Sequence, residues 1–228
     1  MTPAATGRYL VAVQQGLDFD PEPACADGVG ATTVTPLRDP EPLLARTMAA
    51  RGHRDLWVFG YASLIWRPEF DAAEQRLARV HGQHRALQMR SRINRGTPER
   101  PVLVCALVPG GSCSGMVYRI EAARADAELR RLWDREMFTG VYDPKWLQCQ
   151  TSQGPVTALA FTLSRTSPNF TGDIDDDTLL GILRHARGRF GSTLDYLVET
   201  AACLRRCGIR DTAIERQVAL ARRAGLTA

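Results

Sequence analysis

A buried strand is expected at Leu56-Trp57-Val58-Phe59-Gly60, and the chain continues as Tyr61-Ala62-Ser63-Leu64-Ile65-Trp66. The first four residues are large and apolar, which is typical of a strand that is covered on both faces. Small residues at positions 60, 62 and 63 allow the backbone to turn after the strand, so that its N–H groups can face a ligand. This segment predicts a core strand that ends in a turn able to hold a carboxylate or an oxyanion.

The pattern of apolar residues on either side of this segment predicts the fold class. We expect further strands near residues 78–91, 102–108, 115–120, 146–152 and 156–163. Helical spacing predicts helices at residues 41–51, 123–138, 178–190, 193–207 and 211–224. Strands with one inserted helix, followed by a helical C-terminal third, indicate an α+β fold built on a mainly antiparallel sheet or a small barrel.

Proline and glycine punctuate the first forty residues, which show no sustained period. We therefore expect residues 1–40 to form a flexible extension and residues 41–228 to form one domain. The whole chain has 228 residues, of which 44% are hydrophobic, and this is enough for a proper core. Its longest apolar run, at 102–108, is far shorter than the ~20 residues that a membrane helix needs. We expect a soluble, cytoplasmic protein with no membrane partner.

The net charge of +4 does not indicate a nucleic-acid partner, because the arginines are scattered among acidic residues through most of the chain. One local cluster is an exception. It comprises Arg85, Arg90, Arg92, Arg95 and Arg100, with Glu99 as its single acid. Two interpretations remain open at this point: a solvated strand face, or a rim that attracts a small anionic substrate.

No metal site is expected from the spacing of possible ligands. Cys203 and Cys207 lie four residues apart on a predicted helix, but no second Cys or His pair has a matching spacing. The acidic stretch at 173–177 lacks the glycine and the distal glutamate of a calcium loop. Its carboxylates are better explained as the start of the helix that follows, where they meet the positive end of the helix dipole.

The segment 111–115, Gly-Ser-Cys-Ser-Gly, has the frame of a nucleophile elbow with a cysteine at its centre. An elbow needs a helix after the turn, whereas the residues after Gly115 have the pattern of a strand. We therefore interpret the segment as a hairpin turn between the strands at 102–108 and 115–120.

Glu136 is a different kind of acid. On the helix at 123–138, Leu129, Leu132, Trp133 and Met137 define an apolar stripe, and Glu136 lies seven residues after the first and four after the second. Its side chain therefore projects from the buried face or its edge, whereas Arg135 is expected to point elsewhere. Burial raises the pKa of a carboxylate, which makes it a suitable general base near neutral pH. The other interpretation is a structural ion pair with an arginine from a neighbouring strand.

Two segments together resemble the ChaC family of γ-glutamylcyclotransferases. Its signature, a strand entering a Tyr-Gly-Ser-Leu loop, matches residues 59–66, and its Arg-Glu pair near the end of a helix matches residues 133–142. Further similar stretches follow in order along the chain, at residues 84–86, 95–99, 115–119 and 191–196. The resemblance runs from about residue 55 to about residue 205 and is nearest to the bacterial branch.

The resemblance implies a fold, a reaction and a set of site residues. The fold would be the small γ-glutamylcyclotransferase-like barrel with an inserted catalytic helix. The reaction would be cleavage of glutathione into 5-oxoproline and cysteinylglycine, without metal or cofactor. Glu136 would be the catalytic base and then the acid. The substrate would be bound by Val58, Phe59, Gly60, Tyr61, Ala62, Ser63, Leu64 and Tyr196.

The loop departs from the family pattern at Ala62, where glycine is usual. If that position needs a positive φ, alanine is strained there, and substitution with glycine would leave the activity equal or higher. Two alternative functions remain open: cyclisation of other γ-glutamyl amines or amino acids, and a non-catalytic regulator that binds γ-glutamyl peptides. The sequence leaves the oligomeric state open.

Overall fold

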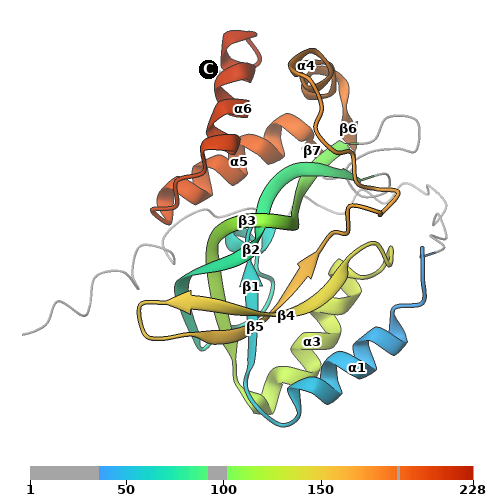
Figure 1. Cartoon of the computed structure of the whole chain (residues 1–228), viewed down its shortest axis with the longest axis vertical. Helices are drawn as coiled ribbons and strands as arrows, with labels where there is room; N and C mark the ends of the chain where they lie inside the picture. Colours follow the sequence, from blue (N-terminus) through green and yellow to red (C-terminus); the bar gives the residue numbers. More distant parts are fainter. Residues whose placement is uncertain (1–35, 92–101, 189–190, 228) are drawn as a thin grey trace, which may run out of the picture. The chain divides into compact units, whose positions relative to one another are not determined.

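The computed structural model of the chain describes residues 36–91, 102–188 and 191–227 (Figure 1). In chain order the elements are α1 (Glu41–Arg51), β1 (Leu56–Gly60), α2 (Ser63–Trp66), β2 (Glu74–Ser91), β3 (Val102–Ile120), α3 (Ala122–Glu136), β4 (Asp143–Thr151), β5 (Val156–Thr162), α4 (Asp176–His185), β6 (Arg187–Gly188), β7 (Gly191–Ser192), α5 (Thr193–Arg206) and α6 (Thr212–Arg223). Residues 1–35 of the predicted extension lie outside the described residues, as do Arg92, Arg95 and Arg100.

The main sheet closes into a barrel with the strand order β1-β3-β2-β4-β5. Four neighbouring pairs are antiparallel, and the barrel is completed where β5 runs parallel to β1 through Val58 and Leu159. A second parallel contact joins Leu107 of β3 to Thr162 of β5. The predicted α+β class, with a small barrel and a helical C-terminal third, is confirmed.

Alternate residues of β1 face two different hydrophobic clusters. Leu56 and Val58 pack with Leu129 and Trp133 of α3, whereas Phe59 packs with residues of the barrel and the C-terminal helices. This separation follows from the two-residue period of a strand, which sends successive side chains to opposite faces. Both faces of β1 are covered, as the apolar run predicts.

β1 and β3 come very close together at their glycines. A Cβ atom added to Gly115 would lie against the carbonyl oxygen of Gly60 and 2.8 Å from Cζ of Phe59. On the other side, a Cβ added to Gly60 would lie 3.1 Å from Cε2 of Tyr118 and 3.2 Å from Cβ of Leu64. The glycines therefore allow β3 to pass directly beside the point where β1 turns into α2.

The prediction of a hairpin turn at residues 111–115 is wrong, because β3 is one continuous strand from Val102 to Ile120. Gly110 and Gly111 have φ angles of 109° and 63°, and Gly82 on the partner strand β2 has a φ of 77°. The register between β2 and β3 shifts at this point, between His81 and Gln83. The glycines let both strands bend together rather than reverse, as in a β-bulge.

The helices form two groups beside the barrel (Figure 1). α1 and α3 lie together against β1 and β5, where Leu44 and Leu132 join the same cluster. α4, α5 and α6 pack together and cover part of β2 and β3. α4 ends at His185, earlier than the predicted 190, because Arg187 and Gly188 pair with Ser192 and Gly191 in a short ladder. Within the described part of the chain, no helix is both long and apolar enough to cross a membrane.

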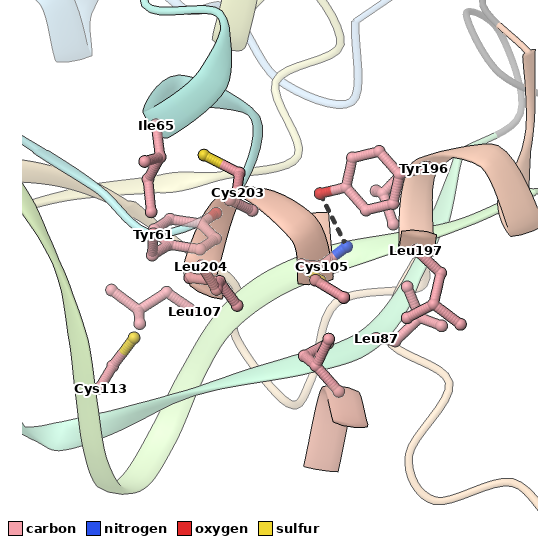
Figure 2. Packing of buried hydrophobic residues seen from close by; sticks show 14 of the residues in the cluster. Tyr61, Ile65, Leu87, Cys105, Leu107, Cys113, Tyr196, Leu197, Cys203 and Leu204 are labelled. Atoms are coloured by element: carbon pink, nitrogen blue, oxygen red, sulfur yellow. Dashed lines mark hydrogen bonds between the residues drawn. The ribbon is translucent and has the colours of Figure 1, made fainter. Parts of the chain in front are cut away.

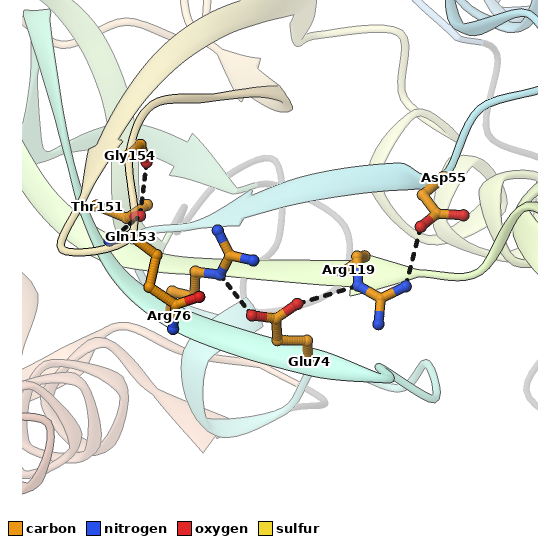
Figure 3. Close-up of polar contacts among 7 residues, drawn as sticks. All are labelled: Asp55, Glu74, Arg76, Arg119, Thr151, Gln153 and Gly154. Carbon is orange, nitrogen blue, oxygen red and sulfur yellow. Dashed lines mark hydrogen bonds and ion pairs between the residues drawn. The ribbon is translucent and has the colours of Figure 1, made fainter. Parts of the chain in front are cut away.

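A chain of charges links β1, β2 and β3 (Figure 3). Arg119 of β3 donates to Asp55 (2.9 Å) and to Glu74 (3.1 Å), and Glu74 also accepts from Arg76 (2.5 Å). Asp55 accepts a further hydrogen bond from the backbone N–H of Ala122, at 2.9 Å. These bonds to the ionised form hold the pKa of Asp55 below its usual range. Asp55 thus connects the start of β1 to the first residue of α3.

The N-terminal end of the described chain also contacts α3. The backbone N–H of Leu37 donates to the carbonyl of Thr139 at 2.8 Å, and Nε1 of Trp133 donates to the carbonyl of Pro40 at 3.1 Å. Residues 37–40 of the predicted extension therefore lie on the residues around the end of α3. α3 is held at its start by Asp55 and at its end by this segment.

Gly115→Ala should destabilise the fold by about 1–3 kcal/mol, because the added methyl group overlaps the backbone of β1. Gly181→Ala on α4 is the matched control: no atom lies within 4 Å of the added Cβ. In a helix this change should instead stabilise by about 0.5–1 kcal/mol. Urea unfolding of both variants measures the difference. Equal effects of the two substitutions would contradict the close contact of β1 and β3.

Candidate active site

A cavity of about 550 Å³ lies where the turn after β1 meets the end of α3. Side chains from β2, β3 and α5 complete its walls. The lining residues are Leu37, Tyr61, Ala62, Ser63, Leu64, Trp66, Arg67, Glu69, Met89, Arg90, Ser91, Val104, Cys105, Asp134, Arg135, Glu136, Phe138, Thr139, Val141, Tyr142, Phe161, Asn169 and Tyr196. This volume is in the range of small-molecule sites.

Glu136 is the last residue of α3 and lines this cavity. Its side chain is 13% exposed, so the burial that the helical period predicts is present. Burial raises the pKa of Glu136, and the neighbouring charge of Arg135 opposes that rise. The result is a carboxyl group whose protonation state is balanced between desolvation and an ion pair.

The sequence predicts that Arg135 points away from Glu136, and this prediction is wrong. Its Nε lies 3.1 Å from Oε1 of Glu136. Successive residues diverge in the interior of a helix, but α3 ends at Glu136, so the two side chains can converge there. Arg135 also contacts Glu69 at 3.0 Å and Oγ of Ser63 at 3.4 Å. It therefore joins the end of α3 to α2 and to the loop that follows it.

The predicted binding segment is divided by the structure. Tyr61, Ala62, Ser63 and Leu64 line the cavity, but Gly60 is not among the lining residues. Val58 and Phe59 are fully buried in the two hydrophobic clusters, because β1 runs between packed layers. The turn itself begins α2 at Ser63 without a side-chain cap from Ala62. The N–H of Ile65 donates to the carbonyl of Ala62 at 2.8 Å, which closes the turn at the start of this short helix.

Ala62 does not occupy the left-handed region of the backbone. Its φ is −146° and its side chain is buried. Among the described residues other than glycine, Glu69 alone has a positive φ, at 57°. The expectation that alanine is strained at position 62 through a positive φ is therefore wrong.

Tyr142 is a lining residue that sequence reasoning missed. It lies beyond the end of α3 and has no periodic signal, although it follows Glu136 closely along the chain. Burial raises the pKa of both Tyr142 and Tyr61, and the charge of Glu136 adds to each rise. The hydroxyl of Tyr61 donates to the carbonyl of Phe161 at 3.0 Å. Both hydroxyls therefore stay neutral and close to the carboxylate.

Tyr196 reaches the cavity from α5. Its hydroxyl accepts a hydrogen bond from the backbone N–H of Cys105 at 3.2 Å, as Figure 2 shows. Its ring meets Trp66 edge to face, with the centroids 6.4 Å apart. A capping box formed by Ser192 and Asp195 fixes the start of α5. Tyr196 follows Asp195 directly, so its position depends on this cap.

Arg85 fits neither interpretation of the arginine cluster. The side chain is 1% exposed and forms an ion pair with Asp211, which is 16% exposed. It also donates to the carbonyl oxygens of Tyr61 and Ser114, the latter at 2.6 Å. Arg85 is thus a buried anchor for the turn after β1, and it is not a rim residue. Arg90, by contrast, lines the cavity.

The other candidate ligand clusters have local explanations. Asp175 caps α4 by accepting from the backbone N–H of Thr178 at 2.7 Å, so the acidic stretch starts a helix as predicted. Cys203 is buried on α5, and Cys207 is partly exposed at its end. In the described ranges, no three His, Cys, Asp or Glu side chains lie together as metal ligands would.

Comparison with known proteins gives one consistent set of relatives. The model of the family described as ChaC-like protein matches residues 56–224. The glutathione-specific gamma-glutamylcyclotransferase of Escherichia coli K12 is 34% identical over 170 residues, which cover 74% of each chain. Glutathione-specific gamma-glutamylcyclotransferase 1 of Mus musculus is 28% identical over 188 residues, or 80% of this chain and 84% of that protein.

A solved structure shows the same fold. The crystal structure of the yeast gamma-glutamyl cyclotransferase specific to glutathione matches with a TM-score of 0.67 at 20% identity. The match covers 75% of this chain and 96% of the yeast chain. At this identity the likeness concerns the fold alone.

Arg85→Met should destabilise the protein by about 3 kcal/mol, because it leaves Asp211 and two carbonyl groups without their buried partner. Arg79→Met is the control, since Arg79 lies on the same strand with an exposed side chain. It should change stability by about 0.5 kcal/mol or less. Thermal and urea unfolding compare the two. A loss no larger for Arg85 than for Arg79 would contradict the anchoring role.

Proposed function

The chain belongs to the ChaC family, and from that premise we propose that it cleaves glutathione by cyclising the γ-glutamyl group, which yields 5-oxoproline and cysteinylglycine. The observation that carries the proposal is a buried carboxylate, Glu136, at a cavity whose wall includes the turn after β1. The relatives described above are named for this reaction.

The reaction is an internal rearrangement that balances without another reactant. The α-nitrogen of the glutamyl group attacks the γ-carbonyl carbon, a five-membered ring closes, and the bond to the cysteine nitrogen breaks. Over the whole reaction the α-nitrogen loses two protons and the departing nitrogen gains two. No water, metal or redox cofactor enters this scheme, because nucleophile and electrophile belong to one molecule. Their shared chain also supplies a high effective concentration once the γ-glutamyl group is folded correctly.

Glu136 suits the proton transfers that this scheme requires. As a carboxylate it accepts a proton from the α-ammonium group, and as the acid it returns a proton to the departing nitrogen. A raised pKa favours this exchange, because the group then gains and loses a proton near the pH at which it works. The charge of Arg135 lowers this pKa and so favours the ionised form that begins the cycle.

The turn after β1 suits the negative charges of the substrate. Backbone N–H groups in the segment 61–64 would stabilise the α-carboxylate or the oxyanion that forms at the γ-carbon. Each donor directed at a developing oxyanion contributes typically ~3 kcal/mol. The buried hydroxyls of Tyr61 and Tyr142 and the ring of Tyr196 complete the pocket around the reacting group. In this proposal Val58, Phe59 and Gly60 support the turn from behind.

A buried carboxylate favours the enzyme over a non-catalytic regulator that binds γ-glutamyl peptides. Burial of an ionised group is costly, and a binding module needs no such group at this position. Cyclisation of other γ-glutamyl amines would use the same machinery, and the assay below separates it from the glutathione reaction. Activity in the presence of a metal chelator would agree with the proposed chemistry.

We also propose the cytoplasm as the place of action. The five cysteines that the structure describes are all free thiols, Cys105, Cys113, Cys149, Cys203 and Cys207. Free thiols persist where reduced glutathione is abundant, which is also where the substrate is found.

Glu136→Gln should lower kcat/KM for 5-oxoproline release from glutathione by about 10²- to 10⁴-fold, because the amide cannot carry the proton. The fold should be at least as stable at neutral pH. The raised pKa means that the ionised carboxylate opposes folding above that pKa, and a neutral amide removes this cost. Purified protein would be assayed with glutathione, oxidised glutathione and γ-glutamyl-alanine, alongside a thermal melt.

Glu128→Gln provides the control for this experiment. Glu128 is a second buried acid on α3, paired with Arg124 and Arg131, and it does not line the cavity. Its variant should keep normal turnover. Full activity of Glu136→Gln, or loss of activity through unfolding, would contradict the base assignment.

Removal of the charge of Arg135 and removal of the charge of Glu69 should shift the pH profile of kcat/KM in opposite directions. Activity requires the carboxylate, so kcat/KM should fall as the pH drops through a pKa above the usual glutamate range. Arg135 lowers this pKa and Glu69 raises it. Arg135→Gln should therefore move the acid limb to higher pH, and Glu69→Gln should move it to lower pH. The exposed Arg131→Gln should leave the profile unchanged.

If the acid limb of the kcat/KM profile stays at the same pH in both Arg135→Gln and Glu69→Gln, the titrating group is not Glu136.

A further inference from the structure

Among the described residues, three arginines line the cavity, and two of them already have carboxylate partners. Arg67 forms an ion pair with Glu69. Arg135 contacts Glu69 at 3.0 Å and Glu136 at 3.1 Å. Both therefore serve the structure around the catalytic carboxylate, and neither is available to a substrate without breaking an existing pair.

Arg90 is the third of these arginines, and its guanidinium pairs with no carboxylate within residues 36–91, 102–188 and 191–227. Arginine keeps its charge in a protein, so a half-buried arginine in the wall of a cavity favours an anionic ligand. Its planar fork matches a carboxylate with two parallel hydrogen bonds.

Hydrogen bonds on both sides hold the backbone of Arg90 in place. Its N–H donates to the carbonyl of Asn169 at 2.8 Å, and Nδ2 of Asn169 donates back to its carbonyl at 2.8 Å. On the other side it pairs with Leu103 of β3. Asn169 and the neighbouring Met89 also line the cavity, and neither carries a charge.

Arg90 and Glu136 come from different walls of the cavity. Glu136 lies at the end of α3, and Arg135 connects it to Ser63 in the turn after β1. Arg90 lies near the end of β2. The reacting γ-glutamyl group belongs beside Glu136 and the turn, so a charge on the β2 wall would meet the other end of the substrate.

We infer that Arg90 binds the C-terminal carboxylate of the departing dipeptide. This inference rests on the proposed function, under which glutathione carries one carboxylate on its glutamyl group and a second on its glycine. Two extended residues span about 7 Å, which separates the second carboxylate from the reacting bond. Arg90 would thus select for substrates that end in a carboxylate beyond the cysteine, in preference to short γ-glutamyl amines.

The test compares glutathione with its monoethyl ester at the glycine carboxyl, by 5-oxoproline release. The wild type should prefer glutathione by about 10-fold or more in kcat/KM, since a charge-assisted hydrogen bond is lost in the ester. Arg90→Gln should reduce that preference to about twofold or less, mainly through a higher KM for glutathione at a similar kcat. Arg90→Lys should keep part of the preference. Arg222→Gln, which removes one exposed arginine from α6, controls for net charge.

Three results would overturn the inference. Arg90→Gln could keep the wild-type preference, the wild type could turn over both compounds equally, or Arg90→Gln could lose both activities in parallel. The third result would identify a structural role, and thermal melts of the variant would show whether it is still folded. A wild-type protein that releases no 5-oxoproline from glutathione would instead overturn the proposed function, and this inference with it.

Discussion

The site depends on the close passage of β3 beside the end of β1. Gly115 brings the backbone of β3 against the carbonyl of Gly60, and a side chain at Gly115 would push the two strands apart. Tyr61, the residue after Gly60, is held from within the core by Arg85. The guanidinium of Arg85 donates to the carbonyl of Tyr61 and also pairs with Asp211. The turn after β1 is therefore set by packing and a buried ion pair before any ligand arrives. A turn fixed in this way keeps its N–H groups oriented at no further entropic cost.

The second part of the site is the end of α3. Asp55 fixes the first residue of the helix, and its amphipathic face packs on β1 and β5. The two parts meet through Arg135, which contacts both Glu136 and Ser63. The same arginine favours the ionised form of the carboxylate and connects it to the turn. A change at Arg135 would therefore alter both the pKa of Glu136 and the contact between the end of α3 and the turn after β1.

Local patterns in the sequence predicted the parts of this structure that depend on local periodicity. The burial of Glu136 follows from the helical stripe of α3, and the fold class follows from the order of strands and helices. The burial of Arg85 could not be found in this way, because its partner Asp211 lies 126 residues away. The contact of Arg135 with Glu136 depends on where α3 ends, and helix ends are set by tertiary packing. The sequence predicts a turn where β3 in fact bends, because glycines allow both conformations.

The closure of the barrel has a consequence for how the protein acquires its pocket. β1 and β5 are far apart in the sequence, and they pair through Val58 and Leu159. The hydrogen bond from Tyr61 to Phe161 likewise joins residues 100 positions apart. Contacts of such high sequence separation require the closure of a large loop, which costs conformational entropy. Tyr196 then arrives on a helix that follows the whole barrel in the chain. On the ribosome, a nascent chain therefore has no complete pocket until almost the entire domain has emerged.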